Sequence, residues 1–225
     1  VMKSAPGPET VINGRRYIYF GGTGYFALHG HPEVIAAGVE AFRKYGVHSA
    51  TSRSGFGNTP VQLELESKLA AYFGTEDALH FVSGYLDNLF LIQALKGRVD
   101  VVAIDETAHF SIRDAVYSAQ KPVITFRHRD PDDLVQKLRS NLKPSQIPLV
   151  MTDGVFPTFG VLAPVPDYLE AIDPYNGVLC LDDSHAVGVL GPNGRGTYDH
   201  YGVRSERCYF AGTMSKAFGA HGGII

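Results

Sequence analysis

Short apolar segments alternate along the chain with longer stretches that carry apolar residues at helical spacing. This alternation is typical of a mostly parallel sheet with helices on both faces, because parallel strands need crossover connections that helices supply. The strand-like segments are residues 78–82, 99–104, 122–126, 148–151, 178–181 and 208–211. The helical stretches are residues 32–45, 60–72, 85–95, 110–119, 131–142 and 166–172. We therefore predict one large α/β domain over residues 31–225, preceded by an N-terminal segment over residues 1–30.

Composition places the chain among soluble globular proteins. Of its 225 residues, 44% are hydrophobic and 19% are charged, and its net charge of -3 is unlike that of a disordered or nucleic-acid-coating chain. The first residues, Val1–Pro6, lack the apolar core of a signal peptide, and no stretch is apolar for long enough to cross a membrane. Cys180 and Cys208 lie in apolar strand-like segments, which favours buried reduced thiols over a disulfide. We expect a cytoplasmic protein that binds neither nucleic acid nor membrane.

Lys216 carries the clearest chemical signal in the sequence. It lies among small residues in the run 212–219, and the apolar segment 178–181 upstream of it ends in Asp182-Asp183-Ser184-His185. A lysine amine that meets a carboxylate and an imidazole from a neighbouring strand end is suited to hold an aldehyde cofactor as a Schiff base. The pattern therefore predicts an enzyme that uses pyridoxal 5'-phosphate (PLP).

Asp182 and His185 close a strand-like segment together, and Asp182 is the better candidate for burial. An ionised carboxylate beside the pyridine nitrogen of PLP would keep that nitrogen protonated and strengthen the ring as an electron sink. His185 would bond the phenolic oxygen of the ring, while Asp183 would face solvent or pair with a basic group. Two alternatives stay open for this cluster: a metal site and a purely structural cap.

Two other strand ends carry polar candidates. Residues Phe81–Tyr85 leave a strand and enter a helix, so backbone N–H groups and the positive end of the helix dipole would bind a phosphate at Ser83 and Gly84. A Ser-Gly pair is also an ordinary turn and helix cap. His109 follows the strand that ends at Ile104 and would project its imidazole into the same crevice, although loop histidines are also common as caps or surface residues.

The motifs occur in one order along nearly the whole chain. They are Tyr25–Leu28 before His31-Pro32, the loop 49–57 before Leu63-Glu64, Ser83–Tyr85, His109, Asp153–Phe156, Asp182–His185, and Thr213 with Lys216. This order resembles the α-oxoamine synthases, PLP enzymes of fold type I in the aminotransferase class I/II superfamily. The family includes aminooxononanoate synthase, aminoketobutyrate CoA ligase, aminolevulinate synthase and serine palmitoyltransferase.

The resemblance implies a role for each matched residue. Lys216 would hold the cofactor and then, as the base, remove the α-proton of the amino-acid substrate. Asp182 would face the pyridine nitrogen and His185 the phenolic oxygen. His109 would stack on the ring face and orient the substrate. The phosphate contacts would come from Ser83, Gly84, Tyr85 and Thr213.

The resemblance also implies a reaction and an assembly. Such an enzyme is an acyltransferase that condenses an amino acid with an acyl thioester, acyl-CoA or an acyl carrier, with loss of carbon dioxide. Members are homodimers with the active site at the subunit boundary. They also carry a smaller C-terminal domain, so we expect the working protein to continue beyond Ile225.

Three residues depart from the family pattern at positions associated with substrate. Thr23 stands where asparagine is usual, Gln62 where a histidine is common, and Pro157 where a hydroxyl residue is usual. These departures keep a second hypothesis open, in which PLP serves transamination, retro-aldol cleavage, or elimination and cyclisation without an acyl donor. A third hypothesis is a fold remnant or interaction module without a complete site.

Overall fold

The computed structural model describes residues 7–225, and the chain divides into two compact units. The sheet unit consists of Ser83–Thr213 and Gly223–Ile225. The N-terminal unit consists of the described residues up to Val82 together with Met214–Gly222. The predicted boundary at residue 30 stays a prediction. Residues 1–6, where the sequence lacks a signal-peptide core, lie outside the described residues.

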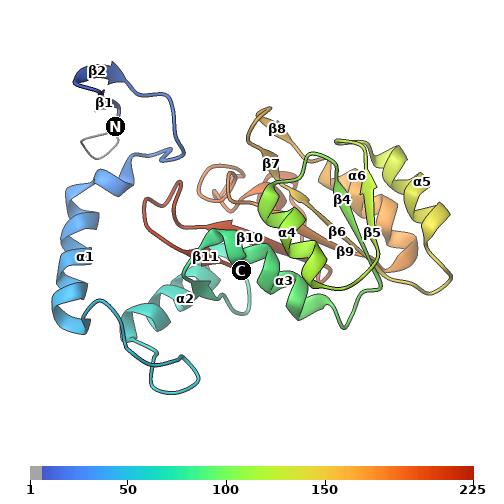
Figure 1. The fold of residues 1–225 in the computed structure, drawn as a ribbon, viewed down its shortest axis with the longest axis horizontal. Coiled ribbons are helices and arrows are strands. Elements are labelled where there is room, and N and C mark those ends of the chain that lie inside the picture. Colours follow the sequence, from blue (N-terminus) through green and yellow to red (C-terminus); the bar gives the residue numbers. More distant parts are fainter. Residues whose placement is uncertain (1–6) are drawn as a thin grey trace. The chain divides into compact units, whose positions relative to one another are not determined.

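The sheet unit is built on mostly parallel strands in the order β11-β10-β9-β6-β4-β5 (Figure 1). Neighbours from β10 to β5 are parallel, and β11 is antiparallel to β10. The strands are β4 (Val101–Asp105), β5 (Val123–Phe126), β6 (Pro148–Asp153), β9 (Val178–Asp182), β10 (Cys208–Thr213) and β11 (Gly223–Ile224). The predicted α/β class with a mostly parallel sheet is confirmed.

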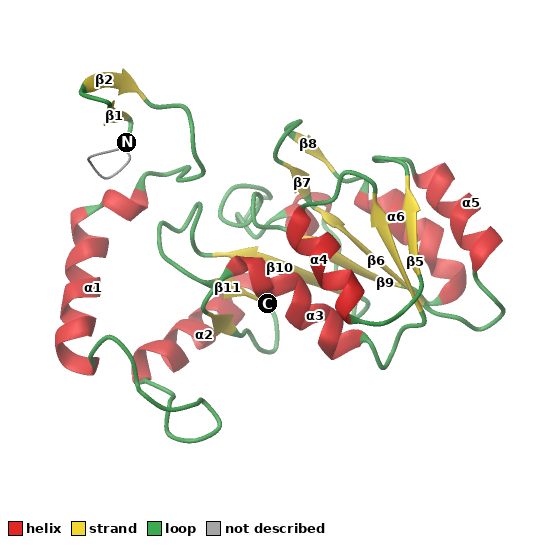
Figure 2. Ribbon diagram, in the orientation of Figure 1, coloured by secondary structure: helices red, strands yellow, loops and turns green. Residues whose placement is uncertain are grey.

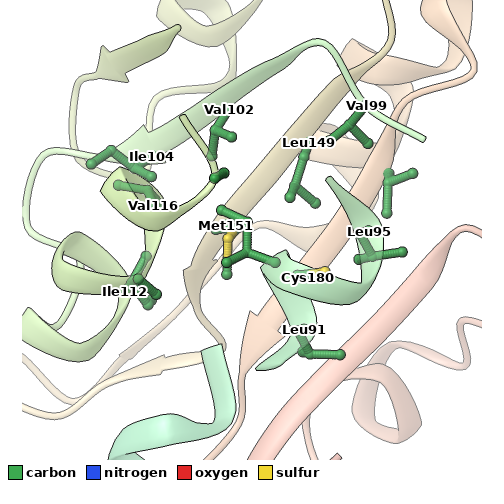
Figure 3. Packing of buried hydrophobic residues seen from close by; sticks show 14 of the residues in the cluster. Leu91, Leu95, Val99, Val102, Ile104, Ile112, Val116, Leu149, Met151 and Cys180 are labelled. Atoms are coloured by element: carbon green, nitrogen blue, oxygen red, sulfur yellow. The ribbon is translucent and has the colours of Figure 1, made fainter. Parts of the chain in front are cut away.

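Helices cover both faces of this sheet (Figure 2). One apolar cluster involves α3 (Asp87–Leu95) and α4 (Phe110–Ser118), and the other involves α5 (Pro131–Asn141) and α6 (Val165–Ile172). Because successive strand residues point to opposite faces, Val102 packs in the first cluster and its neighbour Val101 in the second. Figure 3 shows the first cluster around Met151. Strands buried on both faces explain the near-continuous apolar runs in the sequence.

The N-terminal unit contains a hairpin, two long helices and a short strand. Strands β1 (Glu9–Ile12) and β2 (Arg15–Ile18) pair antiparallel around Asn13-Gly14, both at positive φ, as two-residue hairpin turns require. Helix α1 spans Pro32–Tyr45 and α2 spans Pro60–Phe73, as the sequence predicts, and Thr59 caps α2 through Gln62 N–H. Strand β3 is only His80–Phe81, shorter than the predicted 78–82.

Several short elements escape sequence analysis because they carry too few residues to show a periodicity. They are the antiparallel pair β7 (Val155–Phe156) and β8 (Val161–Leu162), helix α7 (Thr197–Tyr201), and the 3₁₀ turns η1 (Leu28–Gly30), η2 (Gly84–Leu86) and η3 (Asp173–Tyr175). The first turn of the predicted helix 85–95 is η2, and α3 continues from it.

Candidate functional site

Three strands of the sheet unit end in aspartates. Asp105, Asp153 and Asp182 close β4, β6 and β9, and all three are buried. Asp153 and Asp182 are partners in the parallel register. Since parallel strands bring their carboxyl ends to one edge of the sheet, these carboxylates gather where open α/β sheets bind ligands.

Donors from three elements surround the Asp182 carboxylate. Asn88 Nδ2 on α3 lies 2.8 Å from Oδ2, and Ser111 Oγ on α4 lies 3.3 Å from the same oxygen. The backbone N–H of Ser184 donates to Oδ1 at 3.2 Å. Asn88 and Ser111 are buried with it. A carboxylate has about four lone-pair sites, so Asp182 can accept a further hydrogen bond from a donor placed beside it.

His109 is both a helix cap and part of this edge. Its Nδ1 accepts the N–H of Ser111 at 3.2 Å at the start of α4 and lies 2.8 Å from Ser111 Oγ. Its backbone N–H donates to Asp153 Oδ2 at 2.9 Å. The ring meets Tyr85 edge to face, with centroids 6.4 Å apart. The structure therefore brings His109, Tyr85 and Asp182 into one neighbourhood.

Asp153 adds a second buried carboxyl group behind His109. Burial, followed by the negative charge of Asp182, raises the pKa of Asp153, while the hydrogen bond from His109 N–H acts in the opposite direction. Sequence analysis includes Asp153 in a family motif but assigns it no role.

Asp183 is more deeply buried than Asp182, so the predicted ranking of the two is wrong. Asp183 is 1% exposed and Asp182 7%. The expectation that Asp183 faces solvent or a basic group is also wrong, because it accepts the N–H of Thr197 at 2.7 Å and the hydroxyl of Thr197 at 2.5 Å. Gly154 and Gly196 leave no room for a side chain beside it. Burial raises the pKa of Asp183 to about 7. Asp183 thus anchors the loop after β9.

Three of the predicted phosphate residues, Ser83, Gly84 and Tyr85, lie at the start of η2, and the fourth, Thr213, ends β10. Ser83 Oγ accepts the N–H of Tyr85 at 3.2 Å, so the ordinary cap is present. A Cβ added to Gly84 would lie 2.8 Å from Cβ and Oγ1 of Thr213, so glycine lets the backbone approach Thr213 at the end of β10. The Tyr85 hydroxyl donates to Asp114 at 2.5 Å. The hydroxyls of Ser83 and Thr213, together with the start of the helix, form a set of donors suited to an anion.

Lys216 lies in the loop 214–222, which joins β10 to β11 and belongs to the N-terminal unit. Its side chain is half-buried, and its carbonyl accepts the N–H of Gly219 at 3.1 Å. Backbone bonds from Met214 to Gly222 and from Ala220 to Met214, both 2.9 Å, close the loop. His185 is half-buried in the turn after β9.

The three departures from the family pattern occupy different settings. Thr23 lines a cavity of about 720 Å³ in the N-terminal unit, together with Ser215, the neighbour of Lys216. Pro157 lines a cavity of about 270 Å³ in the sheet unit together with His109. Gln62 instead donates to the carbonyl of His80 at 3.4 Å. Gln62 therefore has a structural contact in the N-terminal unit.

Asn88, Ser111 and Thr197 escape sequence analysis. Asn88 is a buried polar residue within the apolar pattern of α3, and Ser111 follows His109 by two residues, so both offer a weak signal. Nothing in the local sequence indicates that Thr197, the first residue of α7, binds Asp183.

Two other classes of site are tested directly by the structure. Among residues 7–225, no three His, Cys, Asp or Glu side chains are grouped as metal ligands. Within the same residues, no helix combines the length and apolar character that crossing a bilayer requires.

Both cysteines are free thiols; Cys180 is buried and Cys208 half-buried.

Comparison with known proteins gives one consistent family. The description aminotransferase class I and II matches residues 22–225. The chain is 35% identical over 225 residues to 8-amino-7-oxononanoate synthase of Thermoanaerobacter pseudethanolicus, covering 100% of this chain and 57% of that protein. It is 36% identical over 224 residues to serine palmitoyltransferase of Sphingobacterium spiritivorum, covering 100% and 56%. The chain thus spans little more than half the length of these curated relatives.

Comparison with solved structures leads to the same family. A structure of SPT with a PLP internal aldimine matches with a TM-score of 0.92 and 33% identity, over 100% of this chain and 56% of that one. Serine palmitoyltransferase of Sphingomonas wittichii matches with a TM-score of 0.92 and 32% identity over the same shares. The predicted fold and the predicted resemblance are both confirmed.

Proposed function

Because the chain belongs to the aminotransferase class I and II family, we propose that it forms the PLP-binding part of a transferase. The enzyme condenses an amino acid with an acyl thioester and releases carbon dioxide. The observation that carries the proposal is the buried Asp182 carboxylate, held by Asn88 and Ser111 at the end of β9. The printed names of the relatives, an oxononanoate synthase and a serine palmitoyltransferase, support this reaction class.

The residues present fit PLP. Gly84 lets the backbone approach Thr213 more closely than a side chain would allow, and the hydroxyls of Ser83 and Thr213 suit a phosphate. Asp182 suits a protonated ring nitrogen. When bound, PLP withdraws electrons from the bond broken at the α-carbon of the substrate.

Each side chain then has a definable task. Lys216 would hold the cofactor through its amine and, once the amino acid has displaced that amine, would take the α-proton of the amino acid. Asp182 would keep a proton on the ring nitrogen, and His185 would hydrogen-bond the phenolic oxygen. His109 would cover one face of the ring and orient the substrate. These tasks come from the family resemblance, and the burial and contacts of Asp182 and His109 support them.

A second candidate reaction uses PLP without an acyl donor. Pro157 lines the cavity that also contains His109, at a position where the family usually has a hydroxyl residue. A lost polar contact beside His109 favours other amino-acid chemistry, namely transamination, retro-aldol cleavage or elimination. Stoichiometric consumption of a thioester would exclude this candidate.

We also propose that the working enzyme is a cytoplasmic homodimer. Helix α1 supports the dimer, because it has no buried residue while Val34, Ile35, Val39 and Phe42 are exposed on it. An exposed apolar face of this kind is typical of an interaction surface, which supports a dimer. Sedimentation of the intact protein would test the assembly.

The deciding experiment begins with the intact protein and PLP. Borohydride reduction and peptide mapping should place the pyridoxyl group on Lys216, and Lys216→Ala should abolish it. Lys96→Ala is the control, since Lys96 bonds Gln93 at the end of α3. Amino acids are then screened with and without acyl-CoA for release of carbon dioxide and free thiol. An adduct on another lysine would refute the site assignment, and turnover independent of any thioester would refute the condensation.

A further inference from the structure

We propose that Asn88 and Ser111 are positioning residues that tie the Asp182 carboxylate and the His109 ring into one hydrogen-bonded set, and so hold the ring nitrogen of the cofactor in place. The inference rests on the proposed function, because it concerns the same site. Neither residue belongs to the motifs that carry the family resemblance.

Asn88 is the centre of the set. Its Nδ2 lies 2.8 Å from Asp182 Oδ2 and 3.2 Å from Ser111 Oγ. An amide nitrogen carries two hydrogens, so it can donate to both oxygens at once. Asn88 is 1% exposed, and bonds to a charged group in such a buried setting are stronger than those at the surface.

Ser111 extends the set to His109. Its hydroxyl has one hydrogen and two possible acceptors, Asp182 Oδ2 at 3.3 Å and His109 Nδ1 at 2.8 Å. The Ser111 N–H already donates to Nδ1, so Nδ1 is an acceptor. The hydroxyl hydrogen can serve either acceptor, so Ser111 links Asp182 to His109, and a hydroxyl lone pair accepts from Asn88. The His109 proton is then on Nε2, where it can donate to a ligand.

Asp153 gives these donors a further role. It is the register partner of Asp182, and the two charges repel each other. The donors from α3 and α4 offset the charge of Asp153 and orient the oxygens of Asp182. Loss of either donor would weaken the interaction of Asp182 with a positively charged ring nitrogen.

The test compares two cofactors in the intact protein. PLP has a ring nitrogen, and its 1-deaza analogue has a C–H in that place. Asn88→Leu should weaken PLP binding about tenfold or more, and Ser111→Ala about threefold to tenfold. Affinity for the deaza analogue should change by less than about twofold, since no nitrogen meets Asp182. Ser118→Ala is the matched control, because its hydroxyl lies on the same helix and bonds Ala115 O at 2.6 Å; it should change neither affinity.

A spectroscopic readout accompanies the affinities. With PLP labelled by ¹⁵N in the ring, the nitrogen resonance should move toward the unprotonated position in Asn88→Leu and stay unchanged in Ser118→Ala. Thermal unfolding of the cofactor-free variants reports folding, and Ser111→Ala decides the question if Asn88→Leu does not fold. Equal weakening of both cofactors, or no weakening, would overturn the inference while the Lys216 adduct stands. Absence of that adduct from the unsubstituted protein would overturn the proposed function and this inference with it.

Discussion

The two units use their apolar residues differently. In the sheet unit, every residue of β4, β6 and β9 is buried, and helices from both faces pack on them. In the N-terminal unit, α1 has no buried residue and α2 has only Leu69. Both helices have the apolar spacing that predicts a helix. The comparison shows that an apolar pattern can predict a helix correctly even where no element of the same unit buries the apolar face of that helix.

A matched pair of isoleucines tests this contrast with the largest expected effect. Ile112 on α4 is fully buried, and Ile35 on α1 is 50% exposed. Ile112→Ala should lower the free energy of unfolding by about 3–4 kcal/mol through lost burial and a cavity. Ile35→Ala should cost less than about 1 kcal/mol. Urea unfolding of both variants, at a concentration where the protein is monomeric, measures the difference; equal losses would refute the contrast.

The buried carboxyls of the sheet unit predict an unusual pH dependence. The folded-state pKa values of Asp153 and Asp183 are raised to about 7, above the ordinary value. The folded protein therefore binds more protons than the unfolded chain between about pH 4 and pH 7. The stability that these groups contribute is complete below that window and is lost as pH rises through about 7.

Asp153→Asn removes one of the two groups and keeps an oxygen for His109 N–H. It should stabilise the protein at pH 8 by on the order of 2 kcal/mol. It should also roughly halve the slope of the free energy of unfolding against pH between pH 4 and 7. Denaturant unfolding across that range measures both. An unchanged slope would mean that Asp153 ionises normally. Asp132→Asn at the start of α5, outside the strand-end cluster, is the control.

Arg53 ties a loop of the N-terminal unit to α2 and β3, so its loss should have a smaller effect. Arg53 binds both oxygens of Glu66, at 2.6 and 2.7 Å, and also contacts the carbonyl of His80. Arg53→Ala should cost about 1 kcal/mol, because the pair is only partly buried. Lys68→Ala removes the exposed pair with Glu64 and should cause no measurable change. Equal effects in thermal unfolding would contradict this ranking.

Phe42→Ser should change stability least and assembly most. Phe42 is 60% exposed on α1, so the monomer loses little when the ring is removed. If α1 is covered by a second chain, sedimentation should show a weaker dimer. Tyr117→Ser, at an exposed position on α4, is the control. An unchanged assembly would separate α1 from the interface.

Local sequence was a good guide where neighbours along the chain decide the outcome. The predicted helical stretches 32–45 and 60–72 begin where α1 and α2 begin, because the caps at His31 and Thr59 and the prolines that follow them act within one turn. Asn13-Gly14 is a recognisable hairpin-turn sequence, but the predicted strands did not include the two that flank it. Asp182 and His109 were found because polar residues at the ends of apolar strands stand out.

The family resemblance and the strand pattern were enough to predict the α/β fold, and Lys216 and Asp182 remain the proposed centre of the chemistry. Tertiary structure alone decided that Asn88 and Ser111 hold Asp182, from 94 and 71 positions away in the chain. It also decided that Asp183 is the more buried of two adjacent carboxylates, because Thr197 returns to it from 14 residues on. The physical reason is that periodicity reports which face of an element is apolar, whereas hydrogen-bond partners depend on which distant elements pack against that face.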